Sequence, residues 1–551
     1  MTEWSHPAWP YLAGALLVGV APAAARPALA LLPPALAIAL AWALPEGRLT
    51  ATIMGQELVW ARVDSLARVF AIVFALVGGL GTLYGLGSSS RRLSVAAFVA
   101  AGAALGIVLA GDWVTLYVFW ETLAIASFFI VGDGGTTRAS NAAFRYLLVH
   151  VAGGALLLAG IAWHLAGNGG LLVGPLPLEG PGALILLAFA VNAAVVPLHP
   201  WLTDAYPESS PAGSVFLSAF VTKAAVYALA RVFPGQEALV WAGATMALYG
   251  VIFAVLQNDI RRLLAYHIVS QVGYMVAGVG LGTPLGINGA AAHAFSHILY
   301  KALLFMGAGA VLHATGRRRL TDLGGLGRAM PATFVLYMIG ALAISGAPLL
   351  NGFVSKSLVV AAAEAEHRWF IAGLLTLASV GTFLSVGLKL PAATFGGPAR
   401  GLTPRAVPAT MLAAMTLTGA LCFVTGVLPS TLYALLPFRV AWEPYTADHV
   451  VGALELLAGT AVTFVMLRRH LGGKPTITLD TDRLYRAAGR WVGHTLAPAI
   501  AGIADSLEAR ADTLVGLSPG VPRHMIAGPV GYAVLLALLT FGIALIALAM
   551  A

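Results

Sequence analysis

The feature that most constrains this chain is a series of apolar stretches, each about twenty residues long, that recurs from one end to the other. A helix of about twenty residues is ~30 Å long, which matches the hydrocarbon thickness of a membrane. Hydrophobic residues make up 59% of the 551 positions and charged residues only 10%, which excludes a soluble globular domain. We therefore predict an all-α polytopic membrane protein with about sixteen transmembrane helices.

The formal net charge of +8 is explained by topology rather than by nucleic-acid binding. Basic residues of membrane proteins gather in cytoplasmic loops. The arginines of this chain fall in alternate connections, at Arg26, Arg91, Arg92, Arg138, Arg261, Arg262, Arg317 to Arg319, Arg468 and Arg469. This pattern predicts a multi-pass protein of a bacterial inner membrane with both termini on the periplasmic side.

Several classes of chemistry are excluded by what lies between the apolar stretches. No interval is long enough for a nucleotide-binding or catalytic domain, and residues 1–10 lack the basic cluster of a signal peptide. The single cysteine, Cys422, excludes an internal disulfide and a cysteine-ligated cluster. We expect no cofactor, no bound metal and no redox or hydrolytic site, so any chemistry takes place within the membrane.

Two of the apolar stretches contain helix-breaking residues. Proline interrupts a helix because it lacks a backbone N–H, and the first break, at residues 196–200, carries Pro197 and Pro200. The second break, at 345–352, has Gly346, Pro348 and Gly352. Paired interrupted segments in corresponding halves indicate a repeat-built transporter with its ion path at the interface of the repeats.

Buried ionisable residues need a functional reason, because a charge at the bilayer centre costs on the order of 2.5–3.5 kcal/mol on insertion scales. Glu121 lies about eight residues, or ~12 Å, into an apolar helix, and Lys223 lies well inside another. Further candidates are His293, His297 and Lys301, spaced i, i+4 and i+8 on one helix face, and Lys356 after the second break.

These residues suit a proton relay. Burial lowers the pKa of a cationic side chain, whereas a nearby carboxylate raises it, so such groups can be tuned to exchange protons. Other interpretations stay open for some of them. Glu121 and Lys223 could form only a structural ion pair, and the spacing of His293 and His297 also suits a metal, although no third ligand is evident.

Secondary candidates lie near the helix ends. Lys389, beside Pro391, is expected to snorkel toward the membrane surface, and Lys356 could do the same. Asp259 is expected to cap a helix and to pair locally at the cytoplasmic surface. His199 lies in the first break, which Asp204 and Glu208 border as either solvated loop charges or the entry of a path.

The motifs together resemble the antiporter-like subunits of respiratory complex I, membrane-bound hydrogenases and Mrp-type cation/proton antiporters. The resemblance covers about residues 100–400. It rests on Phe119-Trp120-Glu121, the segment from Val196 to Ala205, Asp259 to Tyr266 with Ser270-Gln271-Val272-Gly273-Tyr274, His293-x3-His297-x3-Lys301, and Gly352 to Lys356.

The resemblance implies two inverted five-helix repeats, each with one discontinuous helix, around a hydrophilic axis that conducts protons. Glu121, Lys223, His297, Lys301 and Lys356 match axis positions of the family. One position departs, because Asn192 stands where the family usually has a lysine, five residues before Pro197. Since asparagine does not titrate, the first half of the proton path is incomplete.

The expected organisation follows from these elements. It comprises N-terminal helices (1–92), a first antiporter-like repeat (93–235), a second (236–400), C-terminal helices (401–468), an amphipathic segment (469–526) and a final helix (527–551). The amphipathic segment is interpreted as a helix along the membrane surface, loosely similar to the family's lateral helix, or as a plain linker.

Three functional hypotheses follow. The leading one is a proton-conducting subunit of a multi-subunit monovalent cation/proton antiporter. The second is a proton-pumping membrane-arm subunit of a complex I-like dehydrogenase or hydrogenase. The third is a coupling or structural subunit with reduced transport, for example in inorganic-carbon uptake. Expected partners are other membrane subunits, protons, Na⁺ and lipid, and no nucleic acid.

Overall fold

The computed structural model describes residues 6–53, 55–468, 471, 480 and 481. Within this part of the chain, twelve helices are long and apolar enough to cross a membrane, and three shorter apolar helices accompany them. The expected all-α membrane architecture is therefore confirmed. The amphipathic segment at 469–526, apart from residues 471, 480 and 481, and the final apolar stretch at 527–551 lie outside the described residues.

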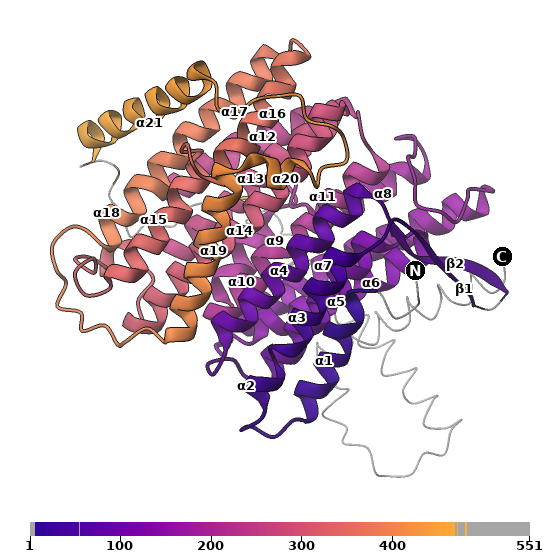
Figure 1. Cartoon of the computed structure of the whole chain (residues 1–551), viewed down its shortest axis with the longest axis horizontal. Helices are drawn as coiled ribbons and strands as arrows, with labels where there is room; N and C mark the ends of the chain where they lie inside the picture. The colour runs from indigo at the N-terminus through magenta and orange to yellow at the C-terminus, as the bar shows by residue number, and fades with distance from the viewer. Residues whose placement is uncertain (1–5, 54, 469–470, 472–479, 482–551) are drawn as a thin grey trace, which may run out of the picture. The chain divides into compact units, whose positions relative to one another are not determined.

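The helices follow one another with short connections (Figure 1). Those before residue 235 are α1 (Ala8–Val20), α2 (Arg26–Leu29), α3 (Leu32–Ala43), α4 (Ser65–Gly85), α5 (Arg91–Leu109), α6 (Trp113–Gly132), α7 (Thr137–Ala166), α8 (Pro181–Asn192), α9 (Pro200–Ala205), α10 (Pro211–Ala219) and α11 (Val221–Val232). Those after it are α12 (Glu237–Leu256), α13 (Ile260–Leu281), α14 (Pro284–Thr315), α15 (Pro331–Ser345), α16 (Asn351–Ala365), α17 (Trp369–Thr382), α18 (Leu390–Thr394), α19 (Ala409–Val427), α20 (Pro429–Tyr433) and α21 (Ala447–Leu467). Short 3₁₀ turns span Tyr206–Glu208 and Leu320–Asp322, and a π-helical segment, Phe383–Lys389, joins α17 to α18.

Both predicted helix breaks are present. The first separates α8 from α9, where Ala194 has a φ of 56°. The second separates α15 from α16, where Gly346 has a φ of 78° and Leu349 one of 72°. Because prolines and left-handed residues cannot continue an α-helix, each break leaves backbone carbonyls of the preceding turn without helical partners.

The connection between α3 and α4 is a β-hairpin, which the sequence did not predict. Strand β1 (Gly47–Ile53) pairs antiparallel with β2 (Gln56–Val63). Directly after β2, the Asp64 side chain accepts a hydrogen bond from the Ala67 N–H and caps α4. The same carboxylate forms a bidentate pair with Arg231 at the end of α11, at 2.6 and 2.7 Å.

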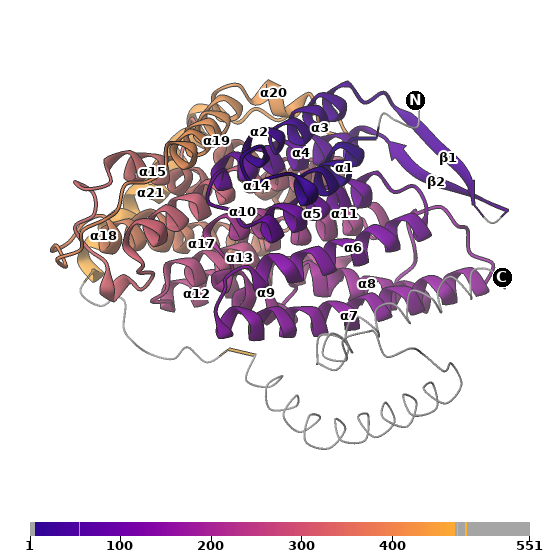
Figure 2. The ribbon, with the colours of Figure 1, turned by 90° about the horizontal axis from the view of Figure 1, so that it is seen from below.

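The longest helix, α14, forms the centre of the helix packing. It packs against α4, α10, α13, α15, α16 and α19, and Figures 1 and 2 show it among these helices. In its most apolar window 94% of the residues are buried, whereas in that of α21 only 6% are. A side chain on α14 is therefore shielded from lipid by other helices, which makes this helix the natural support for an internal site.

Candidate functional site

The histidines and the lysine predicted on one helix face lie at the centre of α14. His293, His297 and Lys301 are all fully buried. Among the described residues, the Nζ of Lys301 has no hydrogen-bond partner and lies 5.8 Å from the centre of the Phe305 ring. Both ring nitrogens of His297 also lack a partner. Buried polar groups are normally satisfied, so a row of unsatisfied ones marks a place for water or proton exchange.

We call His293, His297 and Lys301 the α14 stripe. Side chains from α13 and α16 connect this stripe to the neighbouring helices. The Tyr300 hydroxyl donates to Oε1 of Gln271 at 3.3 Å and lies 3.4 Å from Nε2 of His293. On its other side, Nδ1 of His293 lies 3.4 Å from the Ser355 hydroxyl. Through Tyr300 and Ser355, His293 therefore connects α13 and α14 to α16. Ser355 is the residue directly before Lys356.

Lys356 lies at the second helix break. Its side chain is buried, and Nζ donates a 2.8 Å hydrogen bond to the carbonyl of Ile344 in the last turn of α15. The ammonium also lies 5.1 Å from the centre of the Tyr274 ring. A backbone carbonyl next to the break thus partly solvates this charge. Lys356 lines a pocket of about 360 Å³ between α16, α17 and α21.

Lys223 associates with the α14 stripe rather than with Glu121. Its Nζ donates to the Ser218 carbonyl at 2.6 Å and to the Thr222 hydroxyl at 3.1 Å, at the junction of α10 and α11. The helix that carries Lys223, α11, packs against α14, so the charge of Lys223 acts on Lys301 and on both histidines of α14. No ion pair joins it to Glu121 in the described part of the chain. The interpretation of these two residues as a structural ion pair is therefore wrong.

Glu121 lies in a separate group formed by α6, α7 and α8, which run side by side (Figure 2). A Cβ atom added to Gly154 of α7 would come within 2.0 Å of Oε1 of Glu121, so the carboxylate rests directly on the glycine backbone. The adjacent Gly153 faces Asn192, whose Oδ1 would lie 3.7 Å from an added Cβ. The amide of Asn192 also lies beside the imidazole of His150, which is 1% exposed.

His150 was missed by the sequence analysis, as were Tyr300, Ser355 and His267. His150 stands in an apolar helix, and its burial in a membrane span was the available signal. His267 is fully buried on α13, and its Nε2 lies 2.6 Å from the hydroxyl of Ser385 in the π-helical segment. Hydroxyl groups of Tyr and Ser carry no charge, so no hydropathy argument singles them out.

The acidic residues near the first break are paired. Asp204 contacts Arg145 at 2.6 Å, and Glu208 contacts Arg318 at 2.7 Å. Their side chains are only 16% and 19% exposed, so the interpretation as solvated loop charges is wrong. Asp259 caps α13 as expected, and its charge partner is Arg318 at 2.8 Å. Asp259 and Glu208 together raise the pKa of Arg318, although burial alone would lower it.

Two further secondary candidates lie inside the packed helices. Lys389 is 5% exposed, and its Nζ donates to the carbonyls of Val255 and Gln257 at the end of α12. Snorkelling was therefore the wrong interpretation of Lys389, because a neighbouring helix terminus receives the charge. The His199 ring is fully buried and packs against Tyr249 at 4.9 Å between ring centres.

Two observations limit where the site extends. Among the described residues, no third His, Cys, Asp or Glu joins His293 and His297 in a group able to hold a metal ion.

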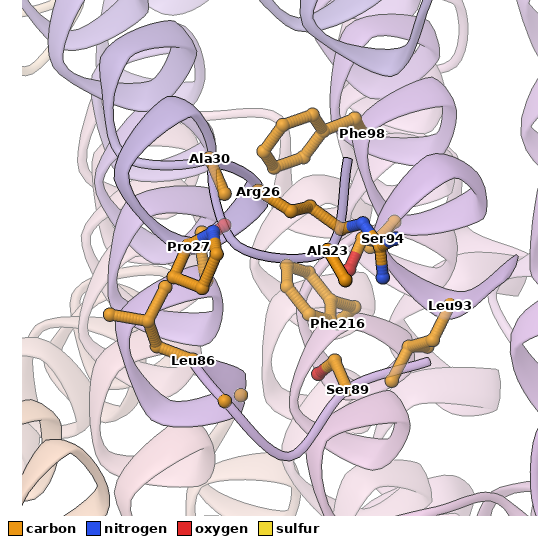
Figure 3. Close-up of a pocket in the computed structure, with 14 residues that line it drawn as sticks. Ala23, Arg26, Pro27, Ala30, Leu86, Ser89, Leu93, Ser94, Phe98 and Phe216 are labelled. Atoms are coloured by element: carbon orange, nitrogen blue, oxygen red, sulfur yellow. The ribbon is translucent and has the colours of Figure 1, made fainter. Parts of the chain in front are cut away.

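A pocket of about 210 Å³ lies apart from the relay candidates, between α2, α4, α5 and α10 (Figure 3). Its lining includes Arg26, Ser89 and Ser94 but no predicted relay residue.

Comparison with known proteins identifies the constellation. Residues 110–385 match the family model described as "NADH:quinone oxidoreductase/Mrp antiporter, TM". This region covers half of the chain and contains every relay candidate from Glu121 to Lys356. The chain belongs to this family. It is thus a multi-pass integral membrane protein, and the family resemblance drawn from the motifs is confirmed.

Individual relatives show the extent of the likeness. The chain is 32% identical over 467 residues to the A/B component of a probable K⁺/H⁺ antiporter of Rhizobium meliloti, covering 76% of this chain and 47% of the relative. It is 36% identical over 302 residues to the D component of a Na⁺/H⁺ antiporter of Alkalihalophilus pseudofirmus, covering 50% and 61%. The chain thus matches about half to three fifths of these relatives' lengths.

A solved structure shares the fold. A chain in the Mrp complex from Dietzia sp. DQ12-45-1b superposes with a TM-score of 0.71 at 24% identity, covering 85% of this protein and all of that chain. The Mrp-like helix arrangement described above therefore extends well beyond the region matched by the family model.

Proposed function

We propose that this member of the NADH:quinone oxidoreductase/Mrp antiporter family is the proton-conducting subunit of a multi-subunit monovalent cation/proton antiporter. Protons move along Lys223, His297, Lys301, His293 and Lys356, and Glu121 controls the first half of the path electrostatically. The observation that carries the proposal is Lys301, a fully buried ammonium without a hydrogen-bond partner among the described residues. A structural role would satisfy that group, whereas a relay needs it free to lose and regain a proton.

The polar contacts supply an order for the steps. Lys223 acts electrostatically on Lys301 and His297, so a proton on one disfavours a proton on the next. Beyond His297, the ring of Tyr300 lies 5.3 Å away between centres, and its hydroxyl reaches His293. Ser355 then bridges His293 to the helix turn that holds Lys356. Contacts of 3.4 Å are long for direct transfer, so water or small side-chain motions complete each step.

The membrane orientation and the repeats belong to the same proposal. We place the protein in a bacterial inner membrane, with the arginine-bearing connections on the cytoplasmic side and both termini on the periplasmic side. Residues 93–235 and 236–400 form two inverted repeats. The two helix breaks, one in each segment, support this division: the first directly follows Asn192, where the family usually has a lysine, and the second lies one turn before Lys356.

Two alternative functions are also consistent with the family. One is a proton-pumping subunit of the membrane arm of a dehydrogenase or hydrogenase; of these two, the family description names the NADH:quinone oxidoreductase. The other is a coupling subunit with reduced transport, which Asn192 favours because a titratable group is missing there. Purification of the native complex and identification of its companion proteins distinguishes a redox complex from an antiporter.

The direct test uses the complex reconstituted into vesicles that contain a pH-sensitive dye. Lys301→Ala and Lys356→Ala should each reduce proton flux to the level of protein-free vesicles while the complex still assembles. Neither change should harm assembly, since removing a buried charge also removes the cost of burying it. Lys389→Ala is the control, because the Lys389 ammonium is held by carbonyls of α12 and should affect stability more than flux. Normal flux in Lys301→Ala would refute the relay.

A further inference from the structure

The helix that the protein covers least carries a carboxylate in the middle of its span. In the most apolar window of α21 only 6% of residues are buried, and Figure 1 shows this helix at the edge of the packed helices, beyond α17. Glu455 lies eight residues after Ala447, about 12 Å from the start of the helix. Its side chain is exposed, and it has no ion pair or hydrogen bond with the described residues.

Glu455 belongs to a regular stripe on that helix. Gly452, Glu455, Gly459, Val462 and Met466 follow one another at spacings of three, four, three and four residues, and all five are exposed. This is the spacing with which one helix packs along another. A Cβ atom added to Gly452 or Gly459 would meet nothing within 4 Å, so the described chain leaves the glycines uncovered. We call these five residues the α21 seam.

The body of the protein packs on a different side of α21. Ala453 and Leu456 line the pocket beside Lys356, Gly452 of the seam lies at the border of that pocket, and Thr460 is 4% exposed. On a helix with 100° between residues, the centre of the seam lies roughly a third of a turn from the mean direction of Ala453, Leu456 and Thr460. The seam is thus a second contact face, next to the one that holds α21 on the protein.

We propose that the α21 seam binds a transmembrane helix from another membrane protein of the complex, and that this helix carries a lysine or arginine at the depth of Glu455. A carboxylate facing lipid at mid-membrane costs several kcal/mol, and a buried cation opposite it removes that cost. The two glycines let the partner backbone approach closely, as small residues do at membrane helix interfaces. The inference rests on the proposed function in that it needs a complex of several membrane proteins, but it does not depend on proton transfer.

The charge of the seam argues against two other occupants. The final apolar stretch of this chain, residues 527–550, contains no Lys, Arg or His and so offers no cation. A second copy that packed through the same seam would bring two Glu455 carboxylates together, because a two-fold contact places like residues near each other. Like charges at such an interface repel.

The first arm of the test is cross-linking in the native membrane. A photo-reactive p-benzoylphenylalanine replaces Val462 in the seam, and the same residue at Leu454, exposed on another face of α21, is the matched control. The proposal expects a cross-link from position 462 to a membrane span of another protein of the complex, about two helical turns from a Lys or Arg at the depth of Glu455, and none to that span from 454. A cross-link to residues 527–550, to a second copy of this chain, or to no protein would overturn it.

The second arm changes the charge and measures assembly rather than flux. Glu455→Lys should reduce co-purification of the cross-linked partner at least about tenfold, because two cations would then face each other. Glu455→Leu, which suits lipid, shows whether the chain itself folds and inserts normally, and exchanging the partner's basic residue for Glu should restore assembly with Glu455→Lys. Wild-type co-purification of Glu455→Lys would overturn the proposal. Because the relay variants Lys301→Ala and Lys356→Ala are expected to change flux and not assembly, whereas the seam variants change assembly, failure of the relay and failure of the seam give different results.

Discussion

Two buried polar clusters lie in the described helices, and they differ in how their ionisable groups are connected. The first cluster consists of Glu121, His150 and Asn192 on α6, α7 and α8. The second consists of Lys223, the α14 stripe, Tyr300 and Lys356. In the second cluster, hydroxyl and imidazole groups connect three helices. In the first, the carboxylate has one buried oxygen without a partner and rests on glycine.

The difference shows that one family framework holds two sites with different degrees of completeness. A lysine at position 192 would place a cation beside His150 and close to the α7 glycines that support Glu121. Asparagine supplies neither charge nor proton. The second cluster, in contrast, keeps all of the basic residues that the family resemblance implies. We therefore expect the second cluster to dominate proton movement and the first to modulate it.

The largest effect expected in the first cluster comes from a single methyl group. In Gly154→Ala the new Cβ would lie 2.0 Å from the Glu121 carboxylate, which must move away. A misplacement of about 1 Å can cost up to roughly 100-fold even when the substitution lies away from the groups that transfer the proton, and we expect a loss of flux of roughly 10- to 100-fold. Proton flux in reconstituted vesicles measures it.

The neighbouring glycine provides the control for this change. In Gly153→Ala the nearest atoms, on Val191 and Asn192, lie at 3.4 Å or more, which is ordinary contact. Both substitutions add the same methyl group to the same helix, so a general effect on α7 would appear in both. Equal flux in the two variants would show that the position of Glu121 does not matter.

In the second cluster, the hydroxyl of Tyr300 is the connection most open to a clean test. Tyr300→Phe removes the hydrogen bond to Gln271 and the contact with His293 without changing the shape of the ring. A neutral hydrogen bond contributes about 1 kcal/mol, so we expect about a fivefold loss of flux. Tyr337→Phe is the matched control, because the Tyr337 hydroxyl is also buried but bonds the Val386 carbonyl outside the cluster. A similar loss in both variants would contradict a role for the Tyr300 connection.

The charged members of these clusters could be predicted from the sequence, and their connections could not. Glu121, Lys223 and Lys301 stand out because apolar surroundings make any charge conspicuous. Which of them lie together depends on helix packing, which the sequence does not show. The sequence therefore allowed an ion pair between Lys223 and Glu121, whereas the structure places Lys223 in the second cluster. The β-hairpin before α4 was missed because residues 47–63 are short, mixed strands in a chain dominated by helical periodicity.

The helix breaks illustrate the opposite case. Proline and glycine act on the backbone of their own segment, so the interruptions after Asn192 and Ser345 could be read from local sequence. The hydrogen-bond partners of the Lys389 ammonium instead lie at the end of α12, more than 130 residues away in the chain. Local rules predict where a helix ends, whereas only the packed structure shows what receives a charge.

A smaller change should follow when the first cluster is completed. Asn192→Lys introduces the basic residue usual in the family at a buried position beside His150. We expect flux to rise, by less than the fivefold change of Tyr300→Phe, because a charge pair buried with Glu121 contributes little net free energy. Asn192→Met, of similar length but without charge, controls for volume. A loss of flux in Asn192→Lys equal to that in Asn192→Met would indicate that charge at this position has no role.

The smallest effect on flux is expected far from both clusters, at the Asp64–Arg231 pair. Burial raises the pKa of Asp64, but the hydrogen bonds and charge of Arg231, with the Ala67 N–H and Arg62, outweigh it and hold the pKa below its usual range. Asp64→Ala should leave flux per folded complex unchanged while lowering stability by about 1 kcal/mol through loss of the helix cap. Since the folded pKa is lowered, the stabilisation is present above the usual pKa of Asp and is lost as pH falls below about 4.

Stability and flux can be separated in this variant because the single cysteine, Cys422, is fully buried. A thiol-reactive dye therefore reports unfolding, and the melting temperatures of wild type and Asp64→Ala should differ at neutral pH and converge in acid. If Asp64→Ala lowered flux as strongly as Gly154→Ala, flux would be following general stability, and the contrast between the two clusters would lose its support. An unchanged flux instead ties the losses in Gly154→Ala and Tyr300→Phe to the groups that those substitutions move or remove.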